Sequence, residues 1–180
     1  MQINIKATLL AGFVLSACAP TRAYLARVAP LEYEQITLAA QPCYKTLHGI
    51  DVLAHDMPCP AREEVEFQTW SIISRIGASW DIFDKTQMIF TEHWIKFPPA
   101  QGRYPGVDGL TVGGNTMIVR ACKQCDRDLI IRHEEGHVLQ YRLNLSRDSK
   151  HSAKLYWEMI ELPPGGSFKI PEHNFPEREK

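Results

Sequence analysis

The segment IIRHEEGHVLQYRL, residues 130–143, places two histidines and two glutamates inside an apolar helical pattern. On an α-helix, His133 and His137 leave the same face one turn apart, because they are four residues apart. Two imidazoles in this arrangement can bind one tetrahedral cation, and Glu134 lies close enough to reach a water on that cation. Glu135 is expected to point away, toward solvent. The spacing therefore predicts a metal site with a carboxylate base beside it.

The apolar residues around this motif make an accidental cluster costly. They occupy most sides of the helix, which we expect to run from about Arg127 to Leu143, so the histidines would be largely buried. An unpartnered buried polar group costs roughly 1 to 3 kcal/mol, and a bound metal removes that cost. The alternative is a pair of surface histidines with a salt-bridged glutamate. Gly136 costs about 1 kcal/mol relative to alanine in mid-helix, so we expect another backbone to pass close to it.

Patterns on both sides of this helix predict a small α+β domain. Pro60 and the acidic residues after it are typical of a helix start, and apolar residues follow at helical spacing. The β-rich run TQMIFTEHWIKF predicts a strand, and LTVGGNTMIVRAC predicts a hairpin that turns through GGN. After the motif helix, AKLYWEMIEL predicts a second helix, which Pro163 stops.

The first residues, MQINIKATLLAGFVLSACAP, have the pattern of an export signal. One lysine precedes an apolar run that is too short to span a membrane. The run ends in LSAC, which resembles the lipobox of bacterial lipoproteins, in which the cysteine becomes the lipid-modified N-terminus. We therefore expect a signal peptide at 1–17, lipidation of Cys18, a tether at 18–40 and the folded domain at 41–180. The alternative is an ordinary signal peptide cut near Ala19.

The expected location and partners follow from the same features. By the lipoprotein resemblance, Ala19 after the cysteine favours the outer membrane of a bacterial envelope, facing the periplasm. The membrane would then be contacted through acyl chains on the N-terminus. The formal net charge is −1 and no run of lysine or arginine occurs. Nucleic acid is not an expected partner, because phosphate binding needs a basic cluster. The oligomeric state is not set by these patterns.

Four cysteines remain after Cys18: Cys43, Cys59, Cys122 and Cys125. An even number in an oxidising compartment predicts two disulfides. Of the three pairings that four cysteines allow, the local one needs the least rearrangement of the chain. It joins Cys43 to Cys59 and Cys122 to Cys125. A four-cysteine zinc site is the alternative, but it lacks a second Cys-x-x-Cys pair.

The HEEGH motif, with the hairpin before it and the helix around Trp70, resembles the zincin metallopeptidases, and in particular the gluzincins. Their common core has a helix, a short twisted and mostly antiparallel sheet, an active-site helix with this motif and a following helix. The resemblance covers about residues 62–162, although only the motif itself matches a defined pattern. It implies that His133 and His137 bind zinc and that Glu134 is the general base.

The resemblance also implies where a peptide substrate binds. The strand at Met117–Arg120, with Ile118 and Val119 at its centre, would be the edge strand that pairs with an extended peptide. An additional donor for the reaction oxyanion is normal in such sites. The donors available for it are Tyr141, Tyr156, His151 and His173.

Catalytic zinc usually keeps three protein ligands and one water, so a third ligand is expected after the HEEGH motif. Glu158 on the following helix is the preferred candidate, because its spacing from His137 is similar to that in thermolysin-like zincins. Glu161, one turn later, and His151, in the connection before that helix, are the alternatives.

These features together predict a zinc-dependent metalloendopeptidase-like hydrolase that is anchored by lipid. Zinc would lower the pKa of its water, and Glu134 would accept the proton as the peptide carbonyl is attacked. Two other functions are considered. One is a non-catalytic, lipid-anchored binding or scaffold protein with a zincin-like domain, and the other is a hydrolase of peptide crosslinks in the cell wall.

Overall fold

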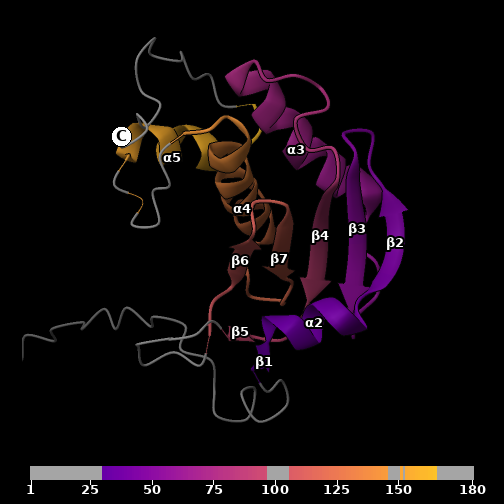
Figure 1. Cartoon of the computed structure of the whole chain (residues 1–180). Helices are drawn as coiled ribbons and strands as arrows, with labels where there is room; N and C mark the ends of the chain where they lie inside the picture. Colours follow the sequence, from indigo (N-terminus) through magenta and orange to yellow (C-terminus); the bar gives the residue numbers. More distant parts are fainter. Residues whose placement is uncertain (1–29, 97–105, 146–150, 152, 166–180) are drawn as a thin grey trace, which may run out of the picture.

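The structure is a computed structural model that describes residues 30–96, 106–145, 151 and 153–165. The predicted signal peptide, Cys18 and His173 lie outside the described residues. The predicted α+β class is confirmed, since helices pack on an open sheet (Figure 1).

A five-stranded sheet forms the centre of the domain, in the order β2-β3-β4-β7-β6. Its two outer pairs, β2 with β3 and β6 with β7, are antiparallel, while the two inner pairs are parallel. The predicted hairpin is confirmed, because β6 turns directly into β7. The strands are β2 (Gln41–Lys45), β3 (Ile50–His55), β4 (Thr86–Thr91), β6 (Gly109–Val112) and β7 (Thr116–Arg120).

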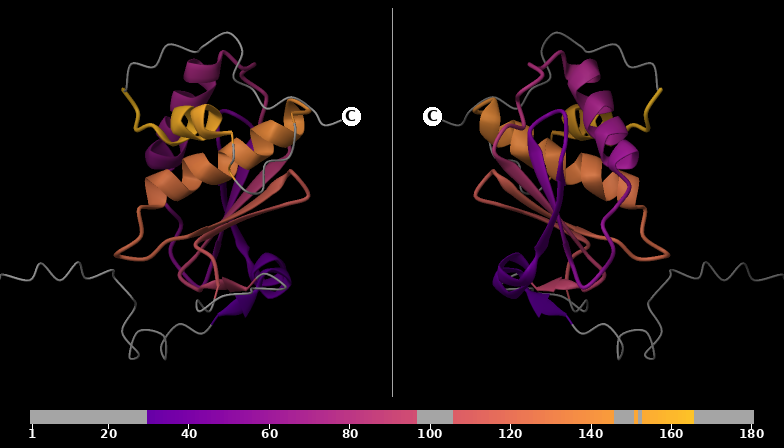
Figure 2. Two further views of the ribbon diagram at one scale, coloured as in Figure 1. Left: turned by 90° about the vertical axis from the view of Figure 1, so that its left-hand side faces the viewer. Right: turned by 90° about the vertical axis from the view of Figure 1, so that its right-hand side faces the viewer.

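Helices cover the two faces of the sheet unequally. Figure 2 shows α4 crossing one face, with α3 and α5 beside it, while the short helix α2 lies at the far end of the strands. The predicted helices at the motif and on either side of it are therefore confirmed. The bounds are α2 (Tyr33–Ala39), α3 (Arg62–Ile76), α4 (Arg127–Arg142) and α5 (Lys154–Glu161).

The alternation of side chains along the strands explains this division. Met88 and Phe90 of β4 join the main core, which also contains the apolar residues of α3, α4 and α5. Ile89 of β4 and Ile118 of β7 point to the opposite face and pack with Ile36 of α2. Successive residues of a strand face opposite sides of the sheet, so strands buried on both faces are apolar throughout.

Local signals set the ends of the two long helices. Helix α3 ends at Gly77, whose φ of 65° is a left-handed conformation that glycine adopts readily. Helix α4 begins after Asp126, whose side chain accepts a hydrogen bond of 3.0 Å from the Leu129 N–H. That bond satisfies one of the backbone donors left free at a helix start.

The folded domain begins earlier than the predicted boundary at residue 41. Within the segment expected to be a tether, Leu31–Glu32 forms strand β1 and is followed by α2. Strand β1 pairs in parallel with β5 (Ile95–Lys96), and Ile36 is fully buried. The sequence pattern missed this because α2 contributes only one buried residue, so its apolar periodicity is weak.

Both predicted disulfides are present. Cys43 of β2 is bonded to Cys59, shortly before α3, and Cys122 is bonded to Cys125 between β7 and α4. The first links the outer strand of the sheet to the start of a helix on its covered face. The second closes the short connection that leads into the motif helix.

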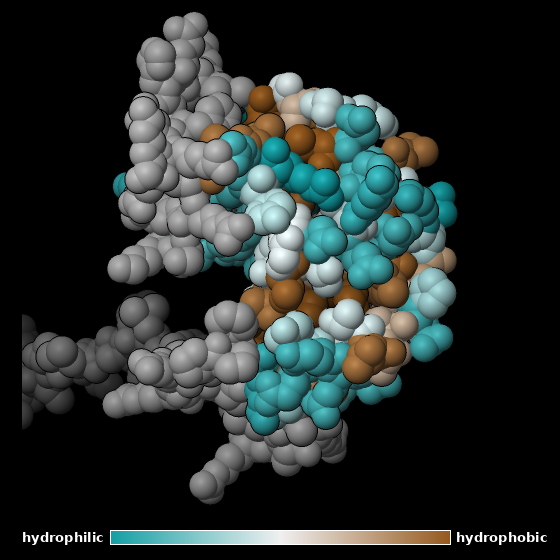
Figure 3. All heavy atoms as spheres, in the orientation of Figure 1, coloured by the Kyte–Doolittle hydropathy of each residue, from teal (hydrophilic) through white to brown (hydrophobic). Residues whose placement is uncertain are grey.

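The helices in the described part of the chain do not resemble membrane-spanning segments. None of its helices has the length and apolar character needed to cross a membrane. On the face shown in Figure 3, hydrophobic areas are separated by hydrophilic ones.

Candidate metal centre

Three histidines converge beside helix α4. His133 and His137 come from α4, as predicted, and His151 comes from the connection that precedes α5. One ring nitrogen from each lies within 4.8 Å of the others. The Nε2 atoms of His137 and His151 are 3.2 Å apart. We call these three residues the helix cluster, and they could hold a metal ion.

Glu161 orients one ring of the helix cluster. Its Oε1 lies 2.8 Å from Nδ1 of His133, at the end of α5. A carboxylate that accepts a hydrogen bond from Nδ1 fixes the tautomer and turns the lone pair of Nε2 toward a metal. Glu161, which was one alternative for the third ligand, therefore contacts a histidine of the cluster in the manner of a supporting residue.

Trp157 of α5 packs against all three histidines. Its ring centroid lies 4.9 Å from that of His133, 4.7 Å from that of His137 and 4.4 Å from that of His151. The indole therefore forms an apolar wall behind the cluster, which restricts the rings to few orientations. Trp157 was not predicted from the sequence, because an aromatic residue on a short amphipathic helix is typical of the hydrophobic core.

Gly136 allows α5 to pack closely on α4. A Cβ at this position would lie 2.8 Å from Cγ2 of Ile160 and 2.9 Å from Cζ3 of Trp157. The predicted close approach is therefore made by side chains and not by a backbone. The hydroxyl of Tyr156 also donates a hydrogen bond of 2.6 Å to the Gly136 carbonyl. Tyr156 is thus part of the packing between the helices and does not face the helix cluster as an oxyanion donor.

Two arginines hold the end of α5 in place. Nη1 of Arg75, on α3, donates a hydrogen bond of 2.7 Å to the Met159 carbonyl. Nε of Arg132, on α4, donates to the Glu161 carbonyl at 3.2 Å. The last carbonyls of a helix have no partner within the helix, so these cations both satisfy the end of α5 and fix its position over the cluster.

Glu134 lies next to the helix cluster and is almost completely buried. Its side chain is 4 % exposed, and its Oε2 accepts a hydrogen bond of 2.7 Å from the Thr111 hydroxyl on β6. Gly109 makes room for it, because a Cβ there would overlap the Glu134 carboxylate. Burial raises the pKa of Glu134 to about 7, against the opposing effects of Thr111 and His133. Such a carboxyl group suits proton transfer near neutral pH.

Glu135 does not point to solvent, contrary to the sequence prediction. It is fully buried, and its Oε1 lies 2.5 Å from the hydroxyl of Thr69 on α3. Burial raises the pKa of Glu135 to about 8, although Thr69 and Arg132 act to lower it. The Thr69 hydroxyl also lies 3.0 Å from the Val65 carbonyl, so it links Glu135 to the backbone of α3. The prediction was wrong because α3 packs over this side of α4.

Glu158 lies outside the helix cluster. It points to solvent with about half of its side chain exposed and forms an ion pair of 3.5 Å with Lys154. Residues four apart share one face of a helix, so Glu158 lies with Lys154, while Trp157 and Glu161 share the face toward α4. The imidazole that joins His133 and His137 is that of His151, the other alternative, and the preferred candidate Glu158 is not among the converging side chains.

A cavity of about 690 Å³ opens beside the cluster and Glu134. Its other walls include Gly109, Leu110 and Thr111 of β6 and Tyr141 of α4. Of the oxyanion donors considered, Tyr141 and His151 line this space. A ligand in the cavity would contact the edge of the sheet on one side and the three imidazoles on the other.

The strand beside the cavity is not the predicted one. Met117, Ile118 and Val119 belong to β7, which lies between β4 and β6, and all three are fully buried. The edge strand beside the cavity is β6, whose only strand partner among the described residues is β7. The sequence indicated the hairpin correctly but could not tell which of its strands pairs with the rest of the sheet.

Comparison with known proteins gives no family for this chain. No family model matches it, and searches of curated proteins and of solved structures also find no match. Its chemistry must therefore be inferred from its own side chains.

Proposed function

We propose that this chain is a zinc-dependent peptidase of the zincin type. The observation that carries the proposal is the convergence of His133, His137 and His151 next to the buried carboxylate of Glu134. Three imidazoles with one open position are a ligand set known for catalytic zinc. The cavity beside them provides space for a substrate.

The helix cluster fits the dimensions of a zinc site. Zinc–nitrogen bonds of about 2.0 to 2.1 Å in a tetrahedron separate two ligand nitrogens by about 3.3 Å. The Nε2 atoms of His137 and His151 are 3.2 Å apart. His133 uses Nδ1 to contact Glu161, which leaves its Nε2 for an ion. In this assignment, His151 is the third ligand and Glu161 supports the first.

Glu134 has the role of general base in the proposed reaction. When bound, zinc supplies a Lewis acid that polarises a peptide carbonyl and lowers the pKa of a water molecule. Glu134 would take a proton from the attacking water molecule as the water oxygen bonds to the carbonyl carbon. The carbon–nitrogen bond then breaks, and Glu134 returns the proton to the leaving amine. Thr111 holds the Glu134 carboxylate through its hydrogen bond of 2.7 Å.

Strand β6 is the proposed binding surface for an extended peptide. It lies at the edge of the sheet, and its residues Gly109 to Thr111 line the cavity. An edge strand can bind a peptide by adding it to the sheet through main-chain hydrogen bonds. This would lay the substrate backbone between β6 and the helix cluster.

We further propose that the protein acts in an oxidising compartment outside the cytoplasm, attached by lipid on Cys18. The two disulfides support such a location, because disulfides persist in oxidising environments. The LSAC sequence supports the lipid anchor. Within a bacterial envelope, this location corresponds to the periplasmic side of the outer membrane.

Replacing Glu134 by glutamine tests the proposed reaction. E134Q keeps the size and hydrogen-bonding capacity of the side chain but cannot accept the proton. We expect unchanged zinc content by atomic emission and a loss of about 10²- to 10⁴-fold in cleavage of unfolded casein or a quenched fluorescent peptide. E158Q is the matched control, since it alters an exposed glutamate of the neighbouring helix and should cleave normally.

Other results would point to other functions. An E134Q protein that cleaves as fast as the wild type contradicts the peptidase proposal. Wild-type protein that binds zinc through the helix cluster but cleaves no peptide would instead be a binding or scaffold protein. Cleavage restricted to crosslinked cell-wall peptides would retain the zinc chemistry and change the substrate.

A further inference from the structure

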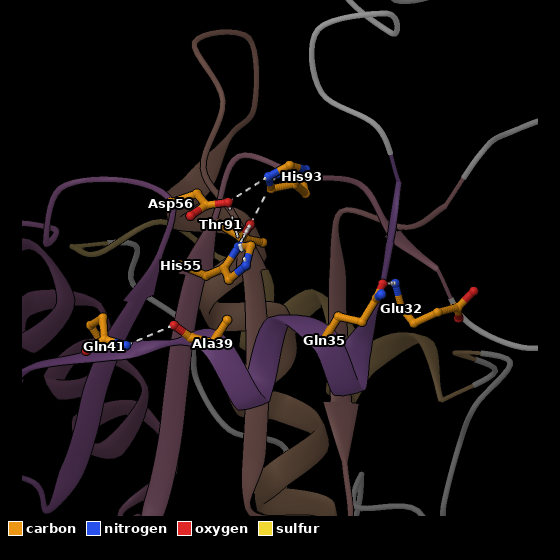
Figure 4. Close-up of polar contacts among 8 residues, drawn as sticks. All are labelled: Glu32, Gln35, Ala39, Gln41, His55, Asp56, Thr91 and His93. Atoms are coloured by element: carbon orange, nitrogen blue, oxygen red, sulfur yellow. Dashed lines mark hydrogen bonds and ion pairs between the residues drawn. The ribbon is translucent and has the colours of Figure 1, made fainter.

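A second group of metal-binding side chains lies at the ends of two neighbouring strands. His55 is the last residue of β3, and Asp56 follows it. His93 comes two residues after Thr91, where β4 ends. Strands β3 and β4 are parallel and pair His55 with Thr91, so both chains leave the sheet at the same place. We call His55, Asp56 and His93 the strand cluster (Figure 4).

The distances within the strand cluster fit a shared ion better than direct hydrogen bonds. Oδ2 of Asp56 lies 3.7 Å from Nε2 of His55 and 3.5 Å from Nε2 of His93. Hydrogen bonds between nitrogen and oxygen are normally about 2.7 to 3.2 Å long. Two ligands of one tetrahedral zinc ion are about 3.3 Å apart, so small movements would bring these atoms to that spacing.

Thr91 orients the buried ring of the cluster. Its Oγ1 lies 3.3 Å from Nδ1 of His55 and accepts a hydrogen bond of 3.2 Å from the His93 backbone N–H. If Nδ1 of His55 carries the proton and donates it to Thr91, Nε2 presents its lone pair toward Asp56. A support of this kind behind a ligating histidine is a regular feature of metal sites.

The cluster combines a fixed side with an accessible side. The side chain of His55 is 6 % exposed and that of His93 is 19 % exposed, whereas that of Asp56 is 70 % exposed. An ion could therefore reach the site from solvent and keep water as a further ligand. Arg120, which pairs with Thr91 across the sheet, does not add an uncompensated positive charge, because it forms an ion pair of 2.7 Å with Asp108.

We propose that the strand cluster is a second binding site for a divalent transition-metal ion of the zinc class. Two imidazoles and one carboxylate suit such ions, whereas calcium and magnesium prefer ligands that are all oxygen. The ion would join the ends of β3 and β4 and the turn after β4. This site is separate in its residues from the helix cluster and does not depend on peptidase activity.

Zinc titration of a chain without the helix cluster tests the second site. The full chain, purified without a polyhistidine tag, carries His133→Ala and His137→Ala, so that remaining zinc binding reports the strand cluster. We expect one equivalent in competition with a chromophoric chelator. Adding D56N or H93Q should weaken zinc binding by roughly 10-fold or more. Loss of a residue that only hydrogen-bonds to a metal ligand already lowers metal affinity by about 10- to 100-fold. Asparagine keeps the left-handed backbone of residue 56, which has a φ of 53°.

Asp51→Asn is the matched control. Asp51 is a half-exposed carboxylate on β3, the strand that ends at His55, and it forms an ion pair with Lys45. When D51N is added to the parent chain, which carries His133→Ala and His137→Ala, zinc affinity should stay the same. A parent that binds no zinc, or an H93Q chain that binds as tightly as the parent, overturns the proposal. If the parent does not fold, wild type and H93Q are compared instead. Two equivalents of zinc bound by wild type and one bound by H93Q support the second site. Equal zinc stoichiometry in the two proteins refutes it. Peptide cleavage by H93Q reports separately on the helix cluster.

Discussion

The helix cluster and the strand cluster use the same kind of side chain but are assembled in different ways. Five of the seven histidines in the chain belong to these two groups. In the helix cluster, two histidines come from consecutive turns of α4, whose rigid geometry sets their spacing. In the strand cluster, His55 and His93 come from separate strands, and only the pairing of β3 with β4 brings them together.

This difference determines what supports each group. The helix cluster is enclosed by α5, with Trp157 against its rings and the Glu161 carboxylate on His133. The strand cluster has one neutral hydroxyl, that of Thr91, behind one ring and an exposed carboxylate in front. We therefore expect the helix cluster to bind an ion more tightly and the strand cluster to exchange it more readily.

The largest expected effect distinguishes His151 from Glu158 as the third ligand of the helix cluster. His151→Ala removes a nitrogen that lies 3.2 Å from Nε2 of His137. It should weaken zinc binding at the helix cluster by more than about 100-fold. A metal ligand contributes at least as much to metal affinity as a residue that only hydrogen-bonds to a ligand. Glu158→Ala should have no effect on zinc affinity. Both are measured by chelator competition in the H93Q background, and the opposite order would restore Glu158 as the ligand.

A smaller effect is expected from Glu161 and Thr91, which contact histidines of the two clusters. Glu161→Gln weakens the contact of 2.8 Å to His133 and should reduce affinity at the helix cluster by about 10- to 100-fold. Thr91→Val removes the neutral contact of 3.3 Å to His55 and should reduce affinity at the strand cluster by less. The measurement is a zinc titration of each variant with the other cluster removed. Equal losses would show that the two supports have the same strength.

The smallest expected effect concerns the close packing of α5 on α4 at Gly136, which supports the helix cluster and not the strand cluster. Gly136→Ala places a Cβ against Ile160 and Trp157, so α5 must shift. Overpacking of this kind costs about 1 to 3 kcal/mol, partly offset by the better helix propensity of alanine, about 1 kcal/mol. Urea unfolding in the presence of a chelator should show a lower free energy of unfolding. Zinc affinity at the strand cluster should stay unchanged, and a loss there would mean that the clusters are coupled.

The sequence predicted those features that depend on neighbouring residues. The spacing of His133 and His137 on one helix, the β6–β7 hairpin and the two local disulfides follow from short patterns, and the structure contains all of them. Features that depend on which elements pack together were not predictable in this way. The side of α5 that faces α4 determines that Glu161, and not Glu158, contacts His133, and the position of α3 buries Glu135.

The strand cluster illustrates the same limit. Nothing local relates His55 to His93, because their proximity arises only when β3 and β4 become neighbours in the sheet. Likewise, the assignment of β6 as the edge strand depends on the order of all five strands. Such features require the topology of the fold, which patterns within a few residues do not contain.

The late position of His151 and α5 in the chain has one more consequence. Helix α4 alone supplies two imidazoles, and the third arrives only when His151 and α5 dock against it. Any ion that binds all three rings must favour the docked state, and docking must favour the ion by the same factor. The degree of order in the last part of the domain would thus follow the zinc supply of its surroundings.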